Sequence, residues 1–87
     1  MASYEVVFKA SVAKDLRRIP NKDVRRILER IEVLAENPRP KGCVKLSALE
    51  RYRVRQGAYR IVYEIRDTEL IVQVVKVAHR REVYQAK

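Results

Sequence analysis

The spacing of apolar side chains along the chain predicts one strand, two helices and then a set of strands. Residues 4–9 are rich in β-branched and aromatic side chains, as a first strand is. A short helix follows and ends before Pro20. A longer helix then carries one apolar stripe, with spacings of three and four residues, formed by Val24, Ile27, Leu28, Ile31, Leu34 and Ala35. Asn37-Pro38 ends this helix, because a residue before proline disfavours the helical conformation.

Residues 52–63 form a predicted β-hairpin around Gly57-Ala58. Gly57 supplies the positive φ that a type II′ turn needs at its first central position. Pairing outward from this turn puts Arg55 opposite Arg60. Like charges directly opposite each other destabilise a sheet. We therefore expect an anion to be held between these two guanidinium groups.

A turn at Asp67-Thr68 leads into a last predicted strand, from Glu69 to Val77. If this turn is tight, alternation along the strand adds three side chains to the apolar face of the hairpin, namely Leu70, Val72 and Val74. The other face then combines arginines with the aliphatic side chains of Ile71, Val75 and Val77. The element order predicts an α+β fold in which an N-terminal strand and two helices accompany a small antiparallel sheet of about four strands. Both helices pack on one face, and residues 1–87 form a single domain.

Composition narrows the choice of partner. The 87 residues carry 20 Lys+Arg against 11 Asp+Glu, a net charge of +9. This excess predicts a polyanionic partner, either nucleic acid or an acidic protein segment. The single cysteine, Cys43, excludes an internal disulfide and favours a reducing compartment. No apolar run approaches the ~18 residues of a membrane span and no signal-peptide pattern is present, so we expect a soluble, cytoplasmic protein without a membrane partner.

The topology brings possible chemistry to one end of the hairpin. If the last strand pairs with residues 59–66, Arg60 lies near Val75 and the segment His79-Arg80 lies near Gly57. Five side chains can then converge on one pocket: Arg55, Arg60, His79, Arg80 and Tyr84. Such a pocket suits RNA cleavage by the internal 2′-hydroxyl, which needs a base, donors for the phosphorane charge and an acid.

Arginine can stabilise charge but is a poor base, because its guanidinium group stays protonated. Proton transfer then falls to His79, Tyr84, Glu82 or the surroundings of the substrate. No cluster of His, Cys or carboxylate residues has metal-ligand spacing, and no cofactor fingerprint is present. We predict neither a metal nor a cofactor.

At three segments the chain resembles the RelE family within the RelE/ParE toxin superfamily. The segments are Lys45-Leu46-Ser47-Ala48-Leu49, the hairpin from Tyr52 to Glu64, and His79-Arg80-Arg81-Glu82-Val83-Tyr84. The resemblance implies a RelE-like toxin of a toxin–antitoxin pair that enters the ribosomal 30S A site and cuts mRNA there. It also implies a cognate antitoxin that inhibits the toxin, and contact with operator DNA only through that antitoxin.

The resemblance implies a role for each matching residue. Arg60 matches the arginine that holds the scissile phosphate, Arg80 matches a stabiliser of the transition state or leaving group, and Tyr84 matches the tyrosine that stacks on or polarises the nucleotide. Arg53 and Arg55 stand where well-studied members have lysines, one of them a candidate base, so the base role moves toward Tyr84 or His79. Four further basic residues are expected to contact RNA or the ribosome: Lys41, Lys45, Arg51 and Arg81.

Two alternatives remain open from the sequence. The first is a ParE-like toxin that shares the fold and inhibits DNA gyrase without cutting RNA. The second is a basic RNA-binding domain without enzymatic activity.

Overall fold

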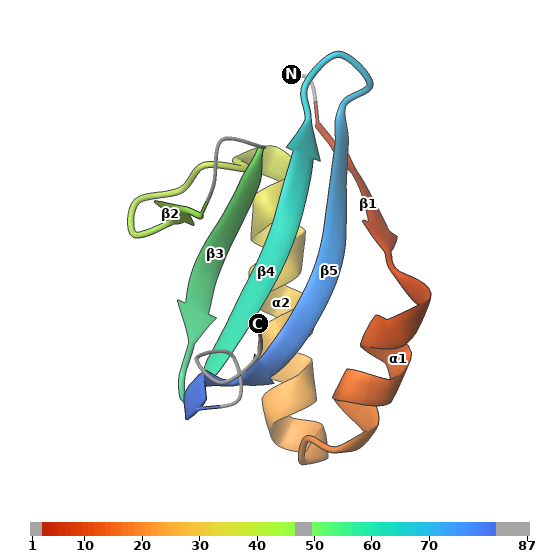
Figure 1. Cartoon of the computed structure of the whole chain (residues 1–87), viewed down its shortest axis with the longest axis vertical. Coiled ribbons are helices and arrows are strands. Elements are labelled where there is room, and N and C mark those ends of the chain that lie inside the picture. The colour runs from red at the N-terminus through yellow and green to blue at the C-terminus, as the bar shows by residue number, and fades with distance from the viewer. Residues whose placement is uncertain (1–2, 47–49, 82–87) are drawn as a thin grey trace.

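The computed structural model describes residues 3–46 and 50–81 and has two helices and five strands (Figure 1). The elements in chain order are β1 (Glu5–Phe8), α1 (Ala10–Arg17), α2 (Asn21–Glu36), β2 (Val44–Lys45), β3 (Arg51–Gln56), β4 (Tyr59–Arg66) and β5 (Ile71–His79). The predicted order of strand, helix, helix and strands is confirmed. Within the described residues, no helix is long and apolar enough to cross a membrane.

The five strands form one sheet in the order β1-β5-β4-β3-β2. All neighbours are antiparallel except β1 and β5, which run parallel from the pair Glu5 and Ile71 to the pair Phe8 and Val74. The sheet therefore has one strand more than expected and is antiparallel only in part. β2 has two residues, too few for a sequence pattern, and the pairing of β1 joins distant parts of the chain.

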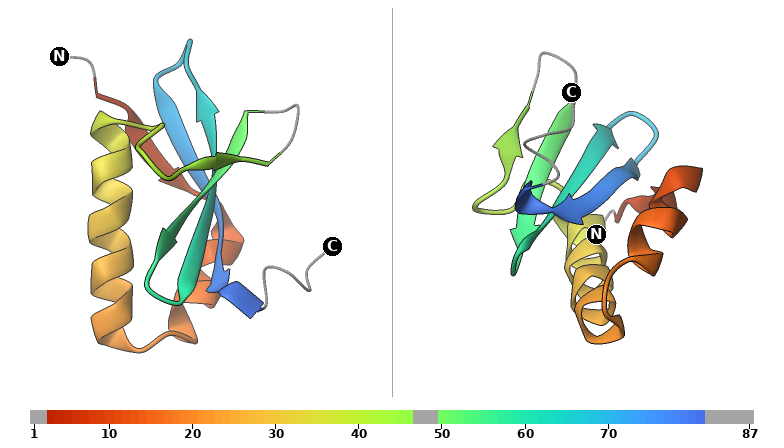
Figure 2. Two further views of the ribbon diagram at one scale, coloured as in Figure 1. Left: turned by 90° about the vertical axis from the view of Figure 1, so that its left-hand side faces the viewer. Right: turned by 60° about the horizontal axis from the view of Figure 1, so that its bottom comes forward.

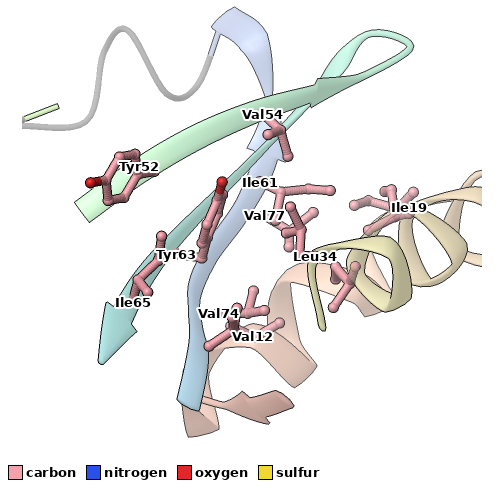
Figure 3. Packing of buried hydrophobic residues seen from close by; sticks show 13 residues of the cluster. Val12, Ile19, Leu34, Tyr52, Val54, Ile61, Tyr63, Ile65, Val74 and Val77 are labelled. Atoms are coloured by element: carbon pink, nitrogen blue, oxygen red, sulfur yellow. The ribbon is translucent and has the colours of Figure 1, made fainter. Parts of the chain in front are cut away.

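Both helices cover the same face of the sheet (Figure 2). The α2 stripe buries Ile27, Ile31 and Leu34, whereas Leu28 of the same stripe stays 37% exposed. From the sheet, the core receives alternate side chains of three strands (Figure 3), among them Val54, Ile61, Tyr63, Val74 and Val77. The helical and strand periodicities thus converge on one core, as the sequence predicted.

The register of β4 against β5 departs from the expected pairing in two ways. The turn takes four residues, 67–70, and ends at Leu70 in the left-handed region (φ 56°), so Leu70 is 39% exposed and not in the core. The register also shifts between Val62, which pairs with Lys76, and Tyr63, which pairs with Val74. A β-bulge of this kind adds one residue to a strand and reverses which face its later side chains take.

Because of this bulge, the predicted positions of Val75 and Val77 in β5 are wrong. Val77 lies opposite Ile61 and is 1% exposed in the core, not on the arginine face. Val75 is the extra residue and, like Ile71, is only half-buried. The alternation rule failed here because it assumes an unbroken ladder, and one inserted residue turns every later position to the opposite face.

At the end of the sheet remote from the β3–β4 turn, Arg39 holds three chain segments together. Its Nη2 atom lies 2.7 Å from Glu50 Oε1 and 2.9 Å from Asp67 Oδ2. Its Nε atom donates to the Tyr52 hydroxyl at 3.1 Å. The Tyr4 hydroxyl donates to Asp67 Oδ1 at 2.7 Å, which links the N-terminal segment to this cluster. The cluster ties the α2–β2 loop and the β4–β5 turn to the sheet.

These contacts make folding pH-dependent. Hydrogen bonds from Lys45, Arg39 and Tyr52 lower the pKa of Glu50 from 4.5 to about 2, and those from Arg39 and Tyr4 lower the pKa of Asp67 from 3.8 to about 2. The unfolded chain therefore takes up protons first as the pH falls.

We expect the melting temperature to hold above about pH 5 and to decrease between about pH 5 and pH 2. In Arg39→Met this decrease should be smaller, as measured by thermal melts at each pH. Arg66→Met, at an exposed arginine 4.0 Å from Glu69, is the control and should follow the wild type.

The Tyr63 hydroxyl closes the core against the end of α2. The ring is fully buried, and the hydroxyl donates to the carbonyl oxygen of Pro38 at 2.6 Å. Tyr63→Phe removes this donor and leaves the buried carbonyl oxygen of Pro38 without it. The free energy of unfolding, measured in urea, should therefore be about 1–2 kcal/mol lower than that of the wild type. Tyr59→Phe is the matched control, because no hydrogen bond of its hydroxyl is found within residues 3–46 and 50–81. A loss of equal size in both variants would contradict the role of the Pro38 contact.

Candidate active site

The β3–β4 hairpin places three arginines on the face of the sheet that the helices leave open. Gly57 has a φ of +61°, as the type II′ turn requires, and the register pairs Arg55 with Arg60 and Arg53 with Val62. Their neighbours Val54 and Ile61 point into the core, so alternation directs the arginines to the opposite face. The predicted register of the hairpin is confirmed.

β5 brings the C-terminal arginine to the same end. Arg60 pairs with Ala78, and the backbone N–H of Arg80 donates to the carbonyl oxygen of Ala58 at 2.9 Å. The predicted approach of residue 80 to the hairpin turn is confirmed. The expected partner of Arg60, Val75, was wrong by three positions: the longer turn accounts for two and the bulge for one.

Arg60 is buried, with 2% of its surface exposed. Val62 and Ala78, its neighbours on the same face, are 8% and 4% exposed. Arg53 is half-buried and Arg55 is exposed. A guanidinium group packed in this way is held in one orientation, and charge interactions are stronger there than in bulk water. The arginine face (Arg53, Arg55, Arg60 and the adjoining Arg80) therefore has one rigid buried member, Arg60, and its other members are half-buried or exposed.

His79 does not join the arginine face. It pairs with Tyr59, and their rings meet edge to face with centroids 5.7 Å apart. Since Ala78 lies beside Arg60 on the open face, alternation turns His79 to the helix side. There it lines a pocket with Asp15, Arg18 and Ile19. The expected convergence of His79 with Arg55 and Arg60 is absent, because closeness in sequence did not account for strand parity.

The other predicted residues are spread over the molecule. Lys45 Nζ lies 3.0 Å from Glu50 Oε2, and Arg51 is paired with Glu64 across β3 and β4. Lys41 and Arg81 are exposed. Ion pairs at the surface are weak, so Lys45 and Arg51 can exchange their partners for a phosphate. Tyr84 and Glu82 lie outside the described residues.

Sequence reasoning missed two polar residues that line this pocket with His79, namely Asp15 and Arg18. Asp15 lies in α1 and Arg18 directly follows this helix, and both line the pocket. Asp15 also joins α1 to β5: Lys76 Nζ donates to Asp15 Oδ1 at 3.2 Å, and the Val77 N–H donates to Asp15 Oδ2 at 3.1 Å. No motif in the sequence marks these residues, since the contact depends on how the helix docks.

The arginine face can stabilise an oxyanion but offers no proton acceptor of its own. Guanidinium groups donate hydrogen bonds to phosphate oxygens in a planar fork and remain charged. Within residues 3–46 and 50–81, no three His, Cys, Asp or Glu side chains are grouped in a way that could hold a metal ion. The face is thus suited to binding a phosphate group and stabilising additional negative charge on it.

A bound anion should relieve the opposition of Arg55 and Arg60. We expect inorganic phosphate to raise the melting temperature. When the phosphate concentration is ten times its Kd, binding should add about 1.4 kcal/mol to the free energy of unfolding. Arg60→Gln should lose most of this stabilisation, whereas Arg25→Gln, at an exposed position on α2, should keep it. Melts in sodium chloride of equal ionic strength separate binding from screening. Equal responses to phosphate and chloride would contradict a phosphate site.

Comparisons with known proteins agree with the predicted resemblance. The family described as "ParE toxin of type II toxin-antitoxin system, parDE" matches residues 6–84. A Methanocaldococcus jannaschii protein assigned as toxin RelE1 is 31% identical over 86 residues, which cover 94% of this chain and 96% of that protein. Toxin RelE of Mycobacterium tuberculosis is 33% identical over 84 residues, which cover 94% of this chain and 87% of that protein.

The fold has a solved counterpart as well. A chain in the crystal structure of the toxin–antitoxin complex RelBE2 from Mycobacterium tuberculosis superposes with a TM-score of 0.81 at 26% identity, covering 92% of this chain and 94% of that one. Sequence and structure thus agree over nearly the whole length. The chain belongs to the RelE/ParE family of toxins of type II toxin–antitoxin systems, with its named relatives among the RelE toxins.

Proposed function

We propose that the protein is a ribosome-dependent mRNA endoribonuclease that cuts messages in the A site without a metal ion. The observation that supports this most directly is the arginine face, where a buried Arg60 lies opposite Arg55 and the backbone of Arg80 is bonded to the hairpin at Ala58. Three guanidinium groups on one face of the hairpin, with a fourth arginine whose backbone is bonded to the hairpin turn, suit the binding of a single phosphate. An inhibitor that works by binding alone has no need of such a grouping.

In the proposed reaction the 2′-hydroxyl oxygen attacks the adjacent phosphorus and the bond to the 5′-oxygen breaks. The products are a 2′,3′-cyclic phosphate and a 5′-hydroxyl. Arg60 holds the phosphate, and Arg80 stabilises the phosphorane or the leaving oxygen. Arg53 and Arg55 add positive charge on the same face. A base must take the proton of the 2′-hydroxyl and an acid must return one to the 5′-oxygen. Because His79 lies on the helix side of the sheet, Tyr84 is the stronger candidate for the base.

The proposed partners follow from charge and from the family. An acidic antitoxin is expected to bind and inhibit the toxin, and the similarity to a chain of the RelBE2 complex supports such a partner. Contact with operator DNA would occur only through the antitoxin. Four basic residues would contact the ribosome or the message: Lys41, Lys45, Arg51 and Arg81. The protein would act in the cytoplasm, where ribosomes translate.

A second candidate function is inhibition of DNA gyrase. It is favoured by one specific observation, that the matching family is described as ParE toxin. The two functions differ in their target, so a supercoiling assay with purified gyrase separates them from mRNA cleavage. Inhibition of supercoiling without cleavage of mRNA would favour this candidate over the endoribonuclease.

The endoribonuclease proposal is tested by primer extension on mRNA in a translating extract. Wild-type protein should produce cuts at ribosomal A sites. Arg60→Ala and Arg80→Ala should each lower the cleavage rate by about 10²–10³, since each removes one donor to the transition state, and should abolish growth arrest.

Folding and charge need matched controls in this experiment. Arg66→Ala removes one exposed positive charge at the opposite end of β4 from Arg60 and should leave cleavage within about two-fold of wild type. Circular dichroism and thermal melts should show that the Arg60 and Arg80 variants remain folded. Full toxicity of both variants, or cuts that occur equally without ribosomes, would refute the proposal.

A further inference from the structure

A pocket of about 260 Å³ lies on the helix side of the sheet, at the same end as the arginine face. Its walls come from α1 and the residues that directly follow it, and from the paired ends of β4 and β5. The lining residues are Asp15, Arg18, Ile19, Tyr59, Val77, Ala78 and His79. None of the roles assigned above uses this pocket.

The pocket combines apolar and aromatic side chains with polar groups. Tyr59 and His79 form an edge-to-face pair with an interplanar angle of 82°. Ile19 and Val77 are 8% and 1% exposed, so the apolar part belongs to the core and is rigid. A site of this kind suits a planar ring, because aromatic and apolar side chains stack against the π face of a base.

The polar groups suit the edges and the phosphate of a nucleotide. The side chain of Asp15 is 13% exposed and is held by Lys76 and by the Val77 N–H at 3.2 and 3.1 Å. A carboxylate has about four lone-pair sites, so two remain to accept hydrogen bonds from a base. Arg18 is exposed at the rim and can donate to a phosphate or to a base acceptor.

The charge of the surroundings favours a polyanion at this end of the molecule. The end of α1, the start of α2, the β3–β4 turn and the end of β5 lie together there (Figure 1). The exposed basic residues of these segments are Lys14, Arg17, Arg18, Lys22, Arg25, Arg26, Arg55, Arg80 and Arg81. At the other end, Glu50 and Asp67 neutralise Arg39. An RNA chain is therefore attracted to the end that holds the pocket.

We propose that this pocket binds one unstacked nucleotide of an RNA, with the base against Tyr59 and His79 and the phosphate toward Arg18. The inference rests on the proposed function in one respect, that the polyanionic partner is RNA. Ala78 and His79 are consecutive and face opposite sides of the sheet, so an RNA that passes around the end of β5 can reach the arginine face and the pocket together. The pocket then acts as a positioning site for the chain whose phosphate is cut.

The test is an NMR titration of the full chain with each of the four nucleoside 5′-monophosphates and with ribose 5-phosphate. Amide signals of Ile19, Tyr59 and His79 should shift, and the nucleotides should bind at least about five-fold more tightly than ribose 5-phosphate, because only they carry a base. Arg18→Gln should weaken binding of the nucleotides by about five-fold or more. Arg17→Gln removes the same charge from the preceding residue, which does not line the pocket, and should stay within two-fold of wild type.

Several results would overturn the inference. Equal affinity for ribose 5-phosphate would exclude a base site, and equal loss in the Arg17 and Arg18 variants would mean nonspecific attraction. If Arg18→Gln weakened binding of the purified antitoxin and left nucleotide binding unchanged, the pocket would belong to the protein partner.

The experiment also separates this inference from the proposed function. Nucleotide binding that persists in Arg60→Ala supports a site distinct from the arginine face. A wild-type protein that binds nucleotides in the pocket and does not cut mRNA on ribosomes would refute the endoribonuclease proposal and not the pocket.

Discussion

The bulged register of β4 against β5 is the constraint on which the rest of this structure depends. With Tyr63 opposite Val74 and Ile61 opposite Val77, the two strands keep one continuous apolar face on either side of the shift. Without the extra residue, the end of β5 would turn Val77 to the open face and expose it. The cost of an interrupted ladder is thus offset by burial of another valine in a domain with few core residues to lose.

The same shift determines which chemistry is possible at this end of the sheet. It sets Ala78, a small side chain, beside Arg60, and it sets His79 beside Tyr59 on the other face. Arg60 is 2% exposed beside this small neighbour. His79 lies on the other side of the sheet from Arg60. One inserted residue therefore separates a cationic face from an aromatic pocket.

The two ends of the sheet use arginine in opposite ways. At the end with Arg39, guanidinium and carboxylate groups neutralise one another, and their hydrogen bonds join loops that the core does not reach. At the hairpin end, two arginines, Arg55 and Arg60, lie directly opposite each other. The chain as a whole carries a net charge of +9, which favours anionic partners.

Local sequence rules were sufficient for the elements and for the hairpin. Periodicity located both helices, and Gly57 determined the turn of the hairpin. Because a two-residue turn leaves one register, it also determined that Arg55 lies opposite Arg60. The resemblance to RelE toxins was likewise visible in the hairpin and the C-terminal segment. Only the tertiary structure decided the length of the β4–β5 turn, the bulge at Val75, the parallel pairing of β1 and the docking of α1 that creates the pocket. These features depend on packing between segments far apart in the chain, where burial of Val77 and Ile61 outweighs the local pattern.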